Sequence, residues 1–230
     1  MAGKLADRLG VRAALGNDVS VAVDAEFQLG AAREADSLLG VFWGTGVGGG
    51  IVLDGKPWQG RGAAGEIGHM VVRIDGALCP CGRRGCMEAY AGRGAMEKRA
   101  REAADAGEET VLFEIMEERG RDRLASGIWK RALKQDDPVA IRLIDEAVEA
   151  IAAAAASAIN LLDIGTVVIG GGLGLKLGEP YVERIDAAMQ PHLFVREHTP
   201  EVKLAELGDL GGAIGATLLL EQSSGVPVAG

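Results

Sequence analysis

The only three cysteines of the chain lie close together in the stretch CPCGRRGC at residues 79–86. An odd number of thiols at such short spacing cannot form a complete set of disulfides. His69 lies ten residues before the first cysteine, whereas the other two histidines are more than a hundred residues further along the chain. Three thiolates and one imidazole are a common ligand set for structural zinc. The sequence therefore predicts a closed zinc site formed by His69, Cys79, Cys81 and Cys86.

Cysteine also occurs as a small apolar residue in protein cores, which is the alternative interpretation of this stretch. The residues between the cysteines, Pro80, Arg83, Arg84 and two glycines, are unsuited to a core and favour a loop around a metal. A catalytic zinc is disfavoured, because four protein ligands leave no coordination position open for a substrate.

A second candidate for chemistry is the glycine-rich stretch GTGVGGG at residues 44–50. Its glycines fit the spacing of a dinucleotide-binding loop, but such a loop must open a helix, and here the apolar run IVLDGK follows. A P-loop is excluded because no Gly-Lys-Ser or Gly-Lys-Thr follows. The pattern predicts a hairpin whose backbone N–H groups could cradle phosphate oxygens, with Thr45 adding a hydroxyl. A glycine-rich hairpin without a ligand is an equally open alternative.

The elements that must position these residues alternate between helices and strands. A helix at 3–9, a strand at VRAAL (11–15), a helix at about 19–33 and two strands around the glycine stretch are expected first. The segment 88–133 is charged and irregularly helical, with a solvated helical excursion over 97–125. The later elements are a capped helix from Pro138 to about Leu162, a strand at 166–169, a turn at 170–172, a helix at 179–190, a strand at 202–207 and a helix from about 211. This alternation is typical of an α/β fold.

Composition narrows the class of protein. With 48% hydrophobic residues, the 230-residue chain can bury an aliphatic core. A net charge of -9 argues against nucleic acid as a partner, because nucleic-acid-binding domains usually carry a basic face. The start, MAGKLADRLG, lacks the apolar core of a signal peptide, and no apolar run reaches the roughly 20 residues of a membrane span. We therefore expect a cytoplasmic protein without membrane partners.

Four segments in order resemble one protein family. They are GNDVSVAVDAE, GVFWGTGVGGGIVLDGKPWQGRGAAGEIGHM, CPCGRRGCMEAYAGR and VVIGGGLG. They are similar to the ROK family of sugar kinases and sugar-responsive repressors, and specifically to its bacterial glucokinase branch. The resemblance covers most of the chain, and the pairing of ExGH with CxCGxxGCxE is its most specific part. It implies an actin-like ATPase (ribonuclease H-like) fold of two α/β domains, of which this chain carries mainly the large C-terminal one.

The resemblance also implies a division of the chain. Residues 1–16 would be a remnant of the N-terminal lobe, residues 17–207 the large sugar- and ATP-binding domain with a zinc loop at 69–86, and residues 208–230 a C-terminal helix and tail. The kinases of the family carry an Asp-x-Gly-Gly-Thr type motif well before their Asn-Asp pair, but here Asn17 is almost at the start of the chain. We therefore expect a fragment or truncated member of a ROK kinase that lacks the N-terminal half-domain and has little or no activity alone.

The family's functional roles fall on residues of the matching motifs. Asp18 would be the general base, and the sugar hydroxyls would be bound by Asn17, Asp18, Glu66, His69 and Glu88. ATP would lie against Gly44, Thr45, Gly46, Gly48, Gly170, Gly171 and Gly172. The implied ligands are a hexose, with glucose expected, Mg-ATP and a structural zinc ion, and the implied assembly is a homodimer. Without the resemblance, Asp18 is better interpreted as a helix cap, and Gly170–Gly172 as a tight turn.

A non-catalytic sugar-binding or ROK-repressor-like regulatory module is the alternative function. A repressor should carry a helix-turn-helix segment ahead of the kinase-like part, and this sequence contains none that we recognise. A pure binding module does not need a general base, so the presence of Asp18 favours kinase ancestry.

Overall fold

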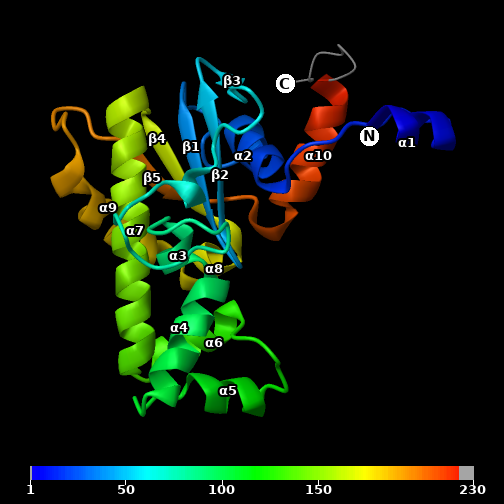
Figure 1. The fold of residues 1–230 in the computed structure, drawn as a ribbon. Helices are drawn as coiled ribbons and strands as arrows, with labels where there is room; N and C mark the ends of the chain where they lie inside the picture. Colours follow the sequence, from blue (N-terminus) through cyan, green and yellow to red (C-terminus); the bar gives the residue numbers. More distant parts are fainter. Residues whose placement is uncertain (1, 223–230) are drawn as a thin grey trace.

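A five-stranded sheet forms the centre of the fold in the computed structural model, which describes residues 2–222 (Figure 1). Its strands are β1 (Leu38–Trp43), β2 (Val47–Leu53), β3 (Lys56–Pro57), β4 (Thr166–Gly170) and β5 (Glu201–Leu204). The strand order is β3-β2-β1-β4-β5, with β1, β2 and β3 paired antiparallel and β1, β4 and β5 paired parallel. Asp54 and Gly55 join β2 to β3 with φ angles of 50° and 70°, which are typical of a two-residue hairpin turn.

The central strands β1 and β4 are apolar on both faces, so both faces of the sheet need cover. Val41 of β1 and Ile169 of β4 belong to the larger core cluster. Leu38 of β1 and Val168 of β4 belong to a smaller cluster on the opposite face. This division follows from the period of two residues along a strand.

The larger cluster is formed with the long helix α7 (Pro138–Leu162), together with α8 (Gly171–Leu177) and α9 (Glu179–Met189). Helix α7 begins where the sequence predicts, because Asp137 accepts a hydrogen bond from the Ala140 N–H at 2.7 Å and Pro138 occupies the first turn. Asp163 follows its last residue as the C-cap, with a left-handed backbone and a φ of 54°. Helix α9 packs along α7 (Figure 1).

The smaller cluster is covered by α2 (Asp18–Leu29), and α10 (Gly211–Gln222) packs on α2 in turn. Gly215 makes that close approach possible, because a Cβ at this position would overlap the carbonyl oxygen of Val21. Helix α1 (Ala2–Leu9) contains no buried residue and extends away from the other helices (Figure 1).

The charged segment folds into α3 (Glu88–Ala91), α4 (Arg93–Asp105), α5 (Leu112–Glu118) and α6 (Ser126–Leu133). Helices α4, α5 and α6 lie beyond the end of the sheet at which β1 turns into β2 (Figure 1). Single 3-10 turns occur at η1 (Ile67–His69), η2 (Gln190–His192) and η3 (Gly208–Leu210). None of the helices within residues 2–222 has both the length and the apolar character that crossing a bilayer requires.

Most of the predicted elements are present, some with shifted ends. The second helix stops at Leu29, before Gly30, and the strand predicted at 202–207 runs over Glu201–Leu204. The strand predicted at 11–15 is wrong: these residues form no strand, and Val11 and Leu15 are exposed. A strand needs a hydrogen-bonded neighbour, and no segment among residues 2–222 pairs with this one. The predicted tail after residue 222 lies outside the described residues.

Candidate active site

The four predicted metal ligands come together at one point. The ligand atoms of His69, Cys79, Cys81 and Cys86 all lie within 4.8 Å of one another. Cys81 Sγ and Cys86 Sγ are 3.8 Å apart, and Cys79 Sγ is 3.8 Å from His69 Nδ1. Tetrahedral zinc with Zn–S bonds of about 2.3 Å requires sulfur atoms about 3.8 Å apart. The donor set and its spacing therefore fit a tetrahedral zinc ion.

A loop with two left-handed glycines brings the cysteines to the histidine. Gly82 and Gly85 have φ angles of +87° and +79°, which other residues rarely adopt. A Cβ on Gly85 would also overlap the carbonyl oxygen of Arg73, so only glycine fits there. An antiparallel bridge between Val71 and Cys86 closes the base of the loop.

The three thiols differ in acidity. Burial raises the pKa of Cys79 to about 12 and also raises the pKa of Cys86. Hydrogen bonds from the backbone and side chain of Arg83 lower the pKa of Cys81 to about 6. Because a metal cation stabilises thiolates, it would oppose the effect of burial on the two buried cysteines.

Glu88 connects the cysteine loop to the glycine turn. It begins α3 two residues after Cys86, and its Oε1 lies 3.9 Å from Cys79 Sγ. Its Oε2 accepts a hydrogen bond from the backbone N–H of Val47 at 2.8 Å. Gly46 leaves room for this carboxylate, since a Cβ on Gly46 would overlap Oε2. Glu88 therefore lies between the metal-ligand cluster and the turn at 44–46.

The start of α2 packs against the start of β2. Asn17 is the N-cap residue, and its Oδ1 accepts hydrogen bonds from the N–H groups of Val19 and Ser20, both at 3.0 Å. Asp18 is the first helical residue, and its exposed side chain accepts from the Val19 N–H at 3.0 Å. Val19 packs on Gly48, where a Cβ would come within 2.7 Å of Val19 Cγ2. The N-cap position that the sequence suggested for Asp18 is thus occupied by Asn17.

Glu66 directly precedes η1 and His69 is its last residue, and η1 packs on β2 as well. Gly68 permits this contact, because a Cβ there would overlap the carbonyl oxygen of Val47. Glu66 is exposed, and His69 is half-buried. The predicted sugar-binding residues thus come from three separate segments, at 17–18, 66–69 and 88. Val19 directly after the first segment, Gly68 within the second, and Glu88 each contact the first residues of β2.

The predicted ATP-binding residues form two adjacent segments. Residues 44–46 make the β1–β2 turn, while residues 170–172 lie where β4 passes into α8. Gly171, with a φ of +78°, fits against the backbone of Trp43, where a Cβ would come within 2.6 Å of the carbonyl oxygen. Because β1 and β4 pair in parallel, the two segments that follow their C-terminal ends lie at the same end of the sheet. Gly48 lies apart from them, inside β2 and under α2.

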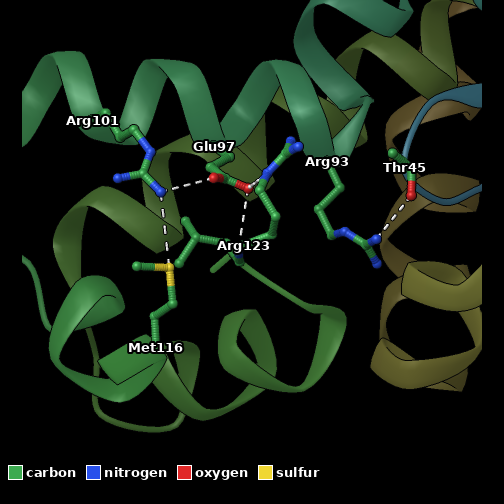
Figure 2. A network of polar contacts seen from close by, with 7 residues as sticks. Thr45, Arg93, Glu97, Arg101, Met116 and Arg123 are labelled. Carbon is green, nitrogen blue, oxygen red and sulfur yellow. Dashed lines mark hydrogen bonds and ion pairs between the residues drawn. The ribbon is translucent and has the colours of Figure 1, made fainter. Parts of the chain in front are cut away.

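A charged network beside the turn has no counterpart among the sequence predictions. Figure 2 shows Glu97 of α4 between Arg101 and Arg123. Glu97 is 4% exposed, and it accepts hydrogen bonds from both arginines at 2.9 Å and from the Leu124 N–H at 3.0 Å. Burial alone would raise the pKa of Glu97, but the hydrogen bonds from Arg123, Arg101 and Leu124 outweigh it and lower the pKa. The segment expected to be solvated therefore contains a buried carboxylate.

Arg93 extends from α4 to the glycine turn (Figure 2). Its backbone N–H donates to the carbonyl oxygen of Gly44 at 3.1 Å, and the Gly94 N–H donates to that of Thr45 at 2.9 Å. Its Nη2 donates to Thr45 Oγ1 and its Nη1 to Ser126 Oγ, both at 2.8 Å. The spacing of four residues between Arg93, Glu97 and Arg101 is the sequence signal that their charges lie on one side of α4.

Comparison with known protein families matches residues 1–223 to the ROK family. The chain belongs to this family. It is 32% identical over 227 residues to a glucokinase of Thermotoga maritima, which covers 96% of this chain and 70% of that protein. It is 38% identical over 159 residues to an N-acetylmannosamine kinase of Vibrio cholerae serotype O1, which covers 68% of this chain and 49% of that protein.

Solved structures of ROK proteins share the fold. A ROK family glucokinase from Streptomyces griseus, crystallised in complex with glucose and AMPPNP, aligns with a TM-score of 0.81 and 32% identity over 96% of this chain and 72% of that chain. The expected α/β fold of the actin-like ATPase type is thereby confirmed. The curated relatives are ROK sugar kinases named for different sugars.

Proposed function

We propose that this ROK protein transfers a phosphoryl group from Mg-ATP to a hexose, with glucose as the expected substrate and hexose 6-phosphate as the product. The observation that carries the proposal is that Val19, which follows Asn17 and Asp18, contacts the start of β2, as do Gly68, which precedes His69, and Glu88. This part of β2 comes directly after the turn at 44–46. Polar groups suited to sugar hydroxyls and backbone groups suited to phosphate are thereby neighbours. Phosphoryl transfer depends mainly on such positioning.

Asp18 is the proposed general base. Its carboxylate would accept the proton of the attacking sugar hydroxyl as the new bond to the γ-phosphorus forms and the bond from that phosphorus to the bridging oxygen breaks, releasing ADP. General-base catalysis is typically worth roughly 10²–10⁴-fold in rate. Asn17 would hold the sugar in place. Because its Oδ1 is occupied by the N–H groups of Val19 and Ser20, its amide nitrogen remains to donate to a hydroxyl.

Glu66, His69 and Glu88 would complete the sugar site. Oε2 of Glu88 accepts from the Val47 N–H, so the carboxylate is held while its remaining lone pairs can accept from a hydroxyl. His69 points Nδ1 towards Cys79 Sγ, which leaves Nε2 for the sugar. Alternating acceptors and donors of this kind suit the vicinal hydroxyls of a hexose.

The turn at 44–46 would receive the phosphates of ATP, and residues 170–172 would border its adenosine. Thr45 would contribute its hydroxyl, and the turn its backbone N–H groups. Magnesium bound to the phosphates would neutralise the negative charge that develops during transfer. Gly48 contributes by its small size, which lets α2 approach β2.

Zinc is the proposed ion of the cluster formed by His69, Cys79, Cys81 and Cys86. Four protein ligands make a closed site, so the ion would be structural and would fix the loop at 69–86 that leads into Glu88. A cytoplasmic location is proposed as well, because thiolate ligation of zinc suits a reducing compartment in which disulfides are disfavoured.

The organisation of the protein is part of the proposal. Residues 17–207 would form the sugar- and ATP-binding domain, residues 208–230 the C-terminal helix and tail, and residues 1–16 a part of the N-terminal lobe. The absence of buried residues in α1 supports the last assignment.

The net charge of -9 supports small molecules as partners, with neither nucleic acid nor membrane. A homodimer is proposed on the resemblance to ROK kinases.

The test is an assay of hexose-dependent ADP formation from Mg-ATP with glucose, mannose and N-acetylmannosamine, combined with calorimetric titration of each sugar. It is run on the 230-residue chain and on this chain fused behind the N-terminal lobe of the Thermotoga maritima glucokinase. We expect very slow turnover for the chain alone and clear glucose-dependent turnover for the fusion. In the fusion, Asp18→Asn should lower turnover by roughly 10² or more while sugar binding persists.

Asp7→Asn in the exposed helix α1 is the matched control and should leave turnover unchanged. Sugar binding without ADP formation from any hexose would favour the non-catalytic sugar-binding module. Binding of neither a hexose nor a nucleotide by the fusion would contradict the proposed function altogether.

A further inference from the structure

Arg93 differs from several other arginines of the chain in the kind of group that it contacts. Its two hydrogen-bond acceptors, Thr45 Oγ1 and Ser126 Oγ, are neutral hydroxyls at 2.8 Å. Arg131 and Arg184, by contrast, each form an ion pair with a carboxylate. Among residues 2–222, no carboxylate lies within ion-pair distance of Arg93.

The acid nearest to Arg93 along α4 is already engaged. Glu97 receives hydrogen bonds from Arg101, Arg123 and the Leu124 N–H. The cluster of Arg93, Glu97, Arg101 and Arg123 thus contains three cations and one anion in a protein that is acidic overall. The pKa of Arg93 is lowered chiefly by its burial; the charge of Glu97 opposes this effect, and the charge of Arg123 adds to it. Unbalanced charge at a partly buried position is a frequent feature of functional sites.

Several hydrogen-bond donors at the turn remain available. A guanidinium has five N–H donors, of which Arg93 uses one for Thr45 and one for Ser126. Because the Thr45 hydroxyl accepts from Arg93, its own proton is free to be donated elsewhere. The backbone N–H groups of Thr45 and Gly46 donate to no acceptor in the described part of the chain. These donors come from one turn and from the side chain that contacts it, so an anion at the turn would meet them together.

We propose that Arg93 binds the phosphate groups of the nucleotide, acting with the Thr45 hydroxyl and the backbone of the turn at 44–46. The inference rests on the proposed function, because it takes the phosphate to be that of ATP. An arginine can hold a phosphate with two parallel N–H donors, which a lysine cannot reproduce. The Thr45 hydroxyl is hydrogen-bonded to Arg93 Nη2. A phosphate oxygen that accepts a hydrogen bond from this hydroxyl would therefore lie close to the guanidinium of Arg93.

The alternative is that Arg93 only ties the turn to α6 through its two hydroxyl contacts. Calorimetric titration separates the two roles, with ATP and adenosine as the ligands and the 230-residue chain as the protein. The variants are Arg93→Met, which removes the charge, and Arg93→Lys, which keeps the charge without the fork of donors. Arg131→Met on α6 is the matched control, because it removes an arginine whose partner is Glu118.

For Arg93→Met we expect the dissociation constant of ATP to rise about tenfold to a hundredfold, with the affinity for adenosine unchanged. The dissociation constant of ATP for Arg93→Lys should lie between those of Arg93→Met and the unmodified chain. The dependence of ATP affinity on salt should be weaker only for Arg93→Met, because only that variant loses the charge. Arg131→Met should bind both ligands normally. Thermal unfolding of each variant reports on its folding, and the lysine variant keeps the test valid if the methionine variant is unstable.

Equal ATP affinity of the unmodified chain and both Arg93 variants would overturn the inference and leave the proposed function in place. A parallel loss of ATP and adenosine binding would also overturn it, in favour of the purely structural role. If the unmodified chain and the fusion with an N-terminal lobe bind neither ATP nor adenosine, the proposed function fails together with the inference.

Discussion

The backbone N–H of Val47 donates to Glu88 Oε2 at 2.8 Å, and this hydrogen bond joins residues that are 41 positions apart. Val47 is the first residue of β2 and follows the glycine turn directly, whereas Glu88 follows the cysteine loop. A carboxylate that accepts a backbone N–H in a partly buried place has little freedom to move. The proposed phosphate and sugar sites are therefore linked through one charge-assisted hydrogen bond.

This link predicts a specific effect of Gly46→Ala. The added Cβ would overlap Glu88 Oε2 and displace the carboxylate from Val47. We expect the hexose dissociation constant to rise about tenfold, as for the loss of one hydrogen bond to a charged group, with zinc content unchanged. Calorimetry and elemental analysis provide the two measurements. Gly3→Ala in α1, where a Cβ meets no atom within 4 Å, is the control, and equal hexose affinity of both variants would refute the prediction.

The second prediction concerns the metal. The purified chain should contain about one zinc ion, and chelation should lower its melting temperature by about 5–10 °C, because the ion holds a loop that contains no helix or strand between η1 and α3. His69→Gln should reduce the zinc content, whereas His198→Gln, at an exposed histidine outside the cluster, should not. Chelator-washed protein that melts at the same temperature with and without added zinc would show that the cluster has no structural metal.

The third prediction concerns Glu97. Because its pKa is lowered in the folded protein, the ionised carboxylate stabilises the fold above its unfolded-state pKa, and this contribution is lost as the pH falls through the folded-state pKa. Glu97→Gln should lower the free energy of unfolding by about 2 kcal/mol near neutral pH. Its difference from the unmodified chain should shrink below about pH 4.

Urea denaturation at several pH values measures this difference. Glu102→Gln on the same helix is the control, because the pair that Glu102 forms with Lys98 is exposed and 3.7 Å long, and its loss should cost less than about 0.5 kcal/mol. A Glu97→Gln variant with the same stability difference at acid and neutral pH would mean that the carboxylate charge has no part in stability.

The elements that could be predicted from the sequence are those with local signals. Asp137 before Pro138 marks the start of α7, and Asp54 with Gly55 marks the turn from β2 to β3. The strand expected at 11–15 failed because strand formation depends on a partner segment, which the local pattern of apolar residues does not reveal. A smaller error concerns the end of the second helix, which the sequence predicts at about residue 33. Helix α2 ends at Leu29, because Gly30 occupies its C-cap position.

The candidate site also contains features with local sequence signals and features that depend on distant partners. The clustering of the three cysteines with His69 could be predicted because all four lie within one short stretch of sequence. The contacts of Arg93 and Glu97 could not be predicted, because their partners Ser126 and Arg123 are 33 and 26 positions away in the sequence. In the sequence, α4 resembles any solvated helix with charges four residues apart.

The attachment of the glycine turn to α4 has an evolutionary consequence. Two of its hydrogen bonds, from the Arg93 N–H to Gly44 and from the Gly94 N–H to Thr45, are made by backbone atoms alone. Backbone hydrogen bonds do not depend on which side chains the donor and acceptor residues carry. The outer surfaces of α4, α5 and α6 can therefore accumulate substitutions without displacing the turn, and this is where we expect members of the family to diverge most freely while the turn keeps its geometry.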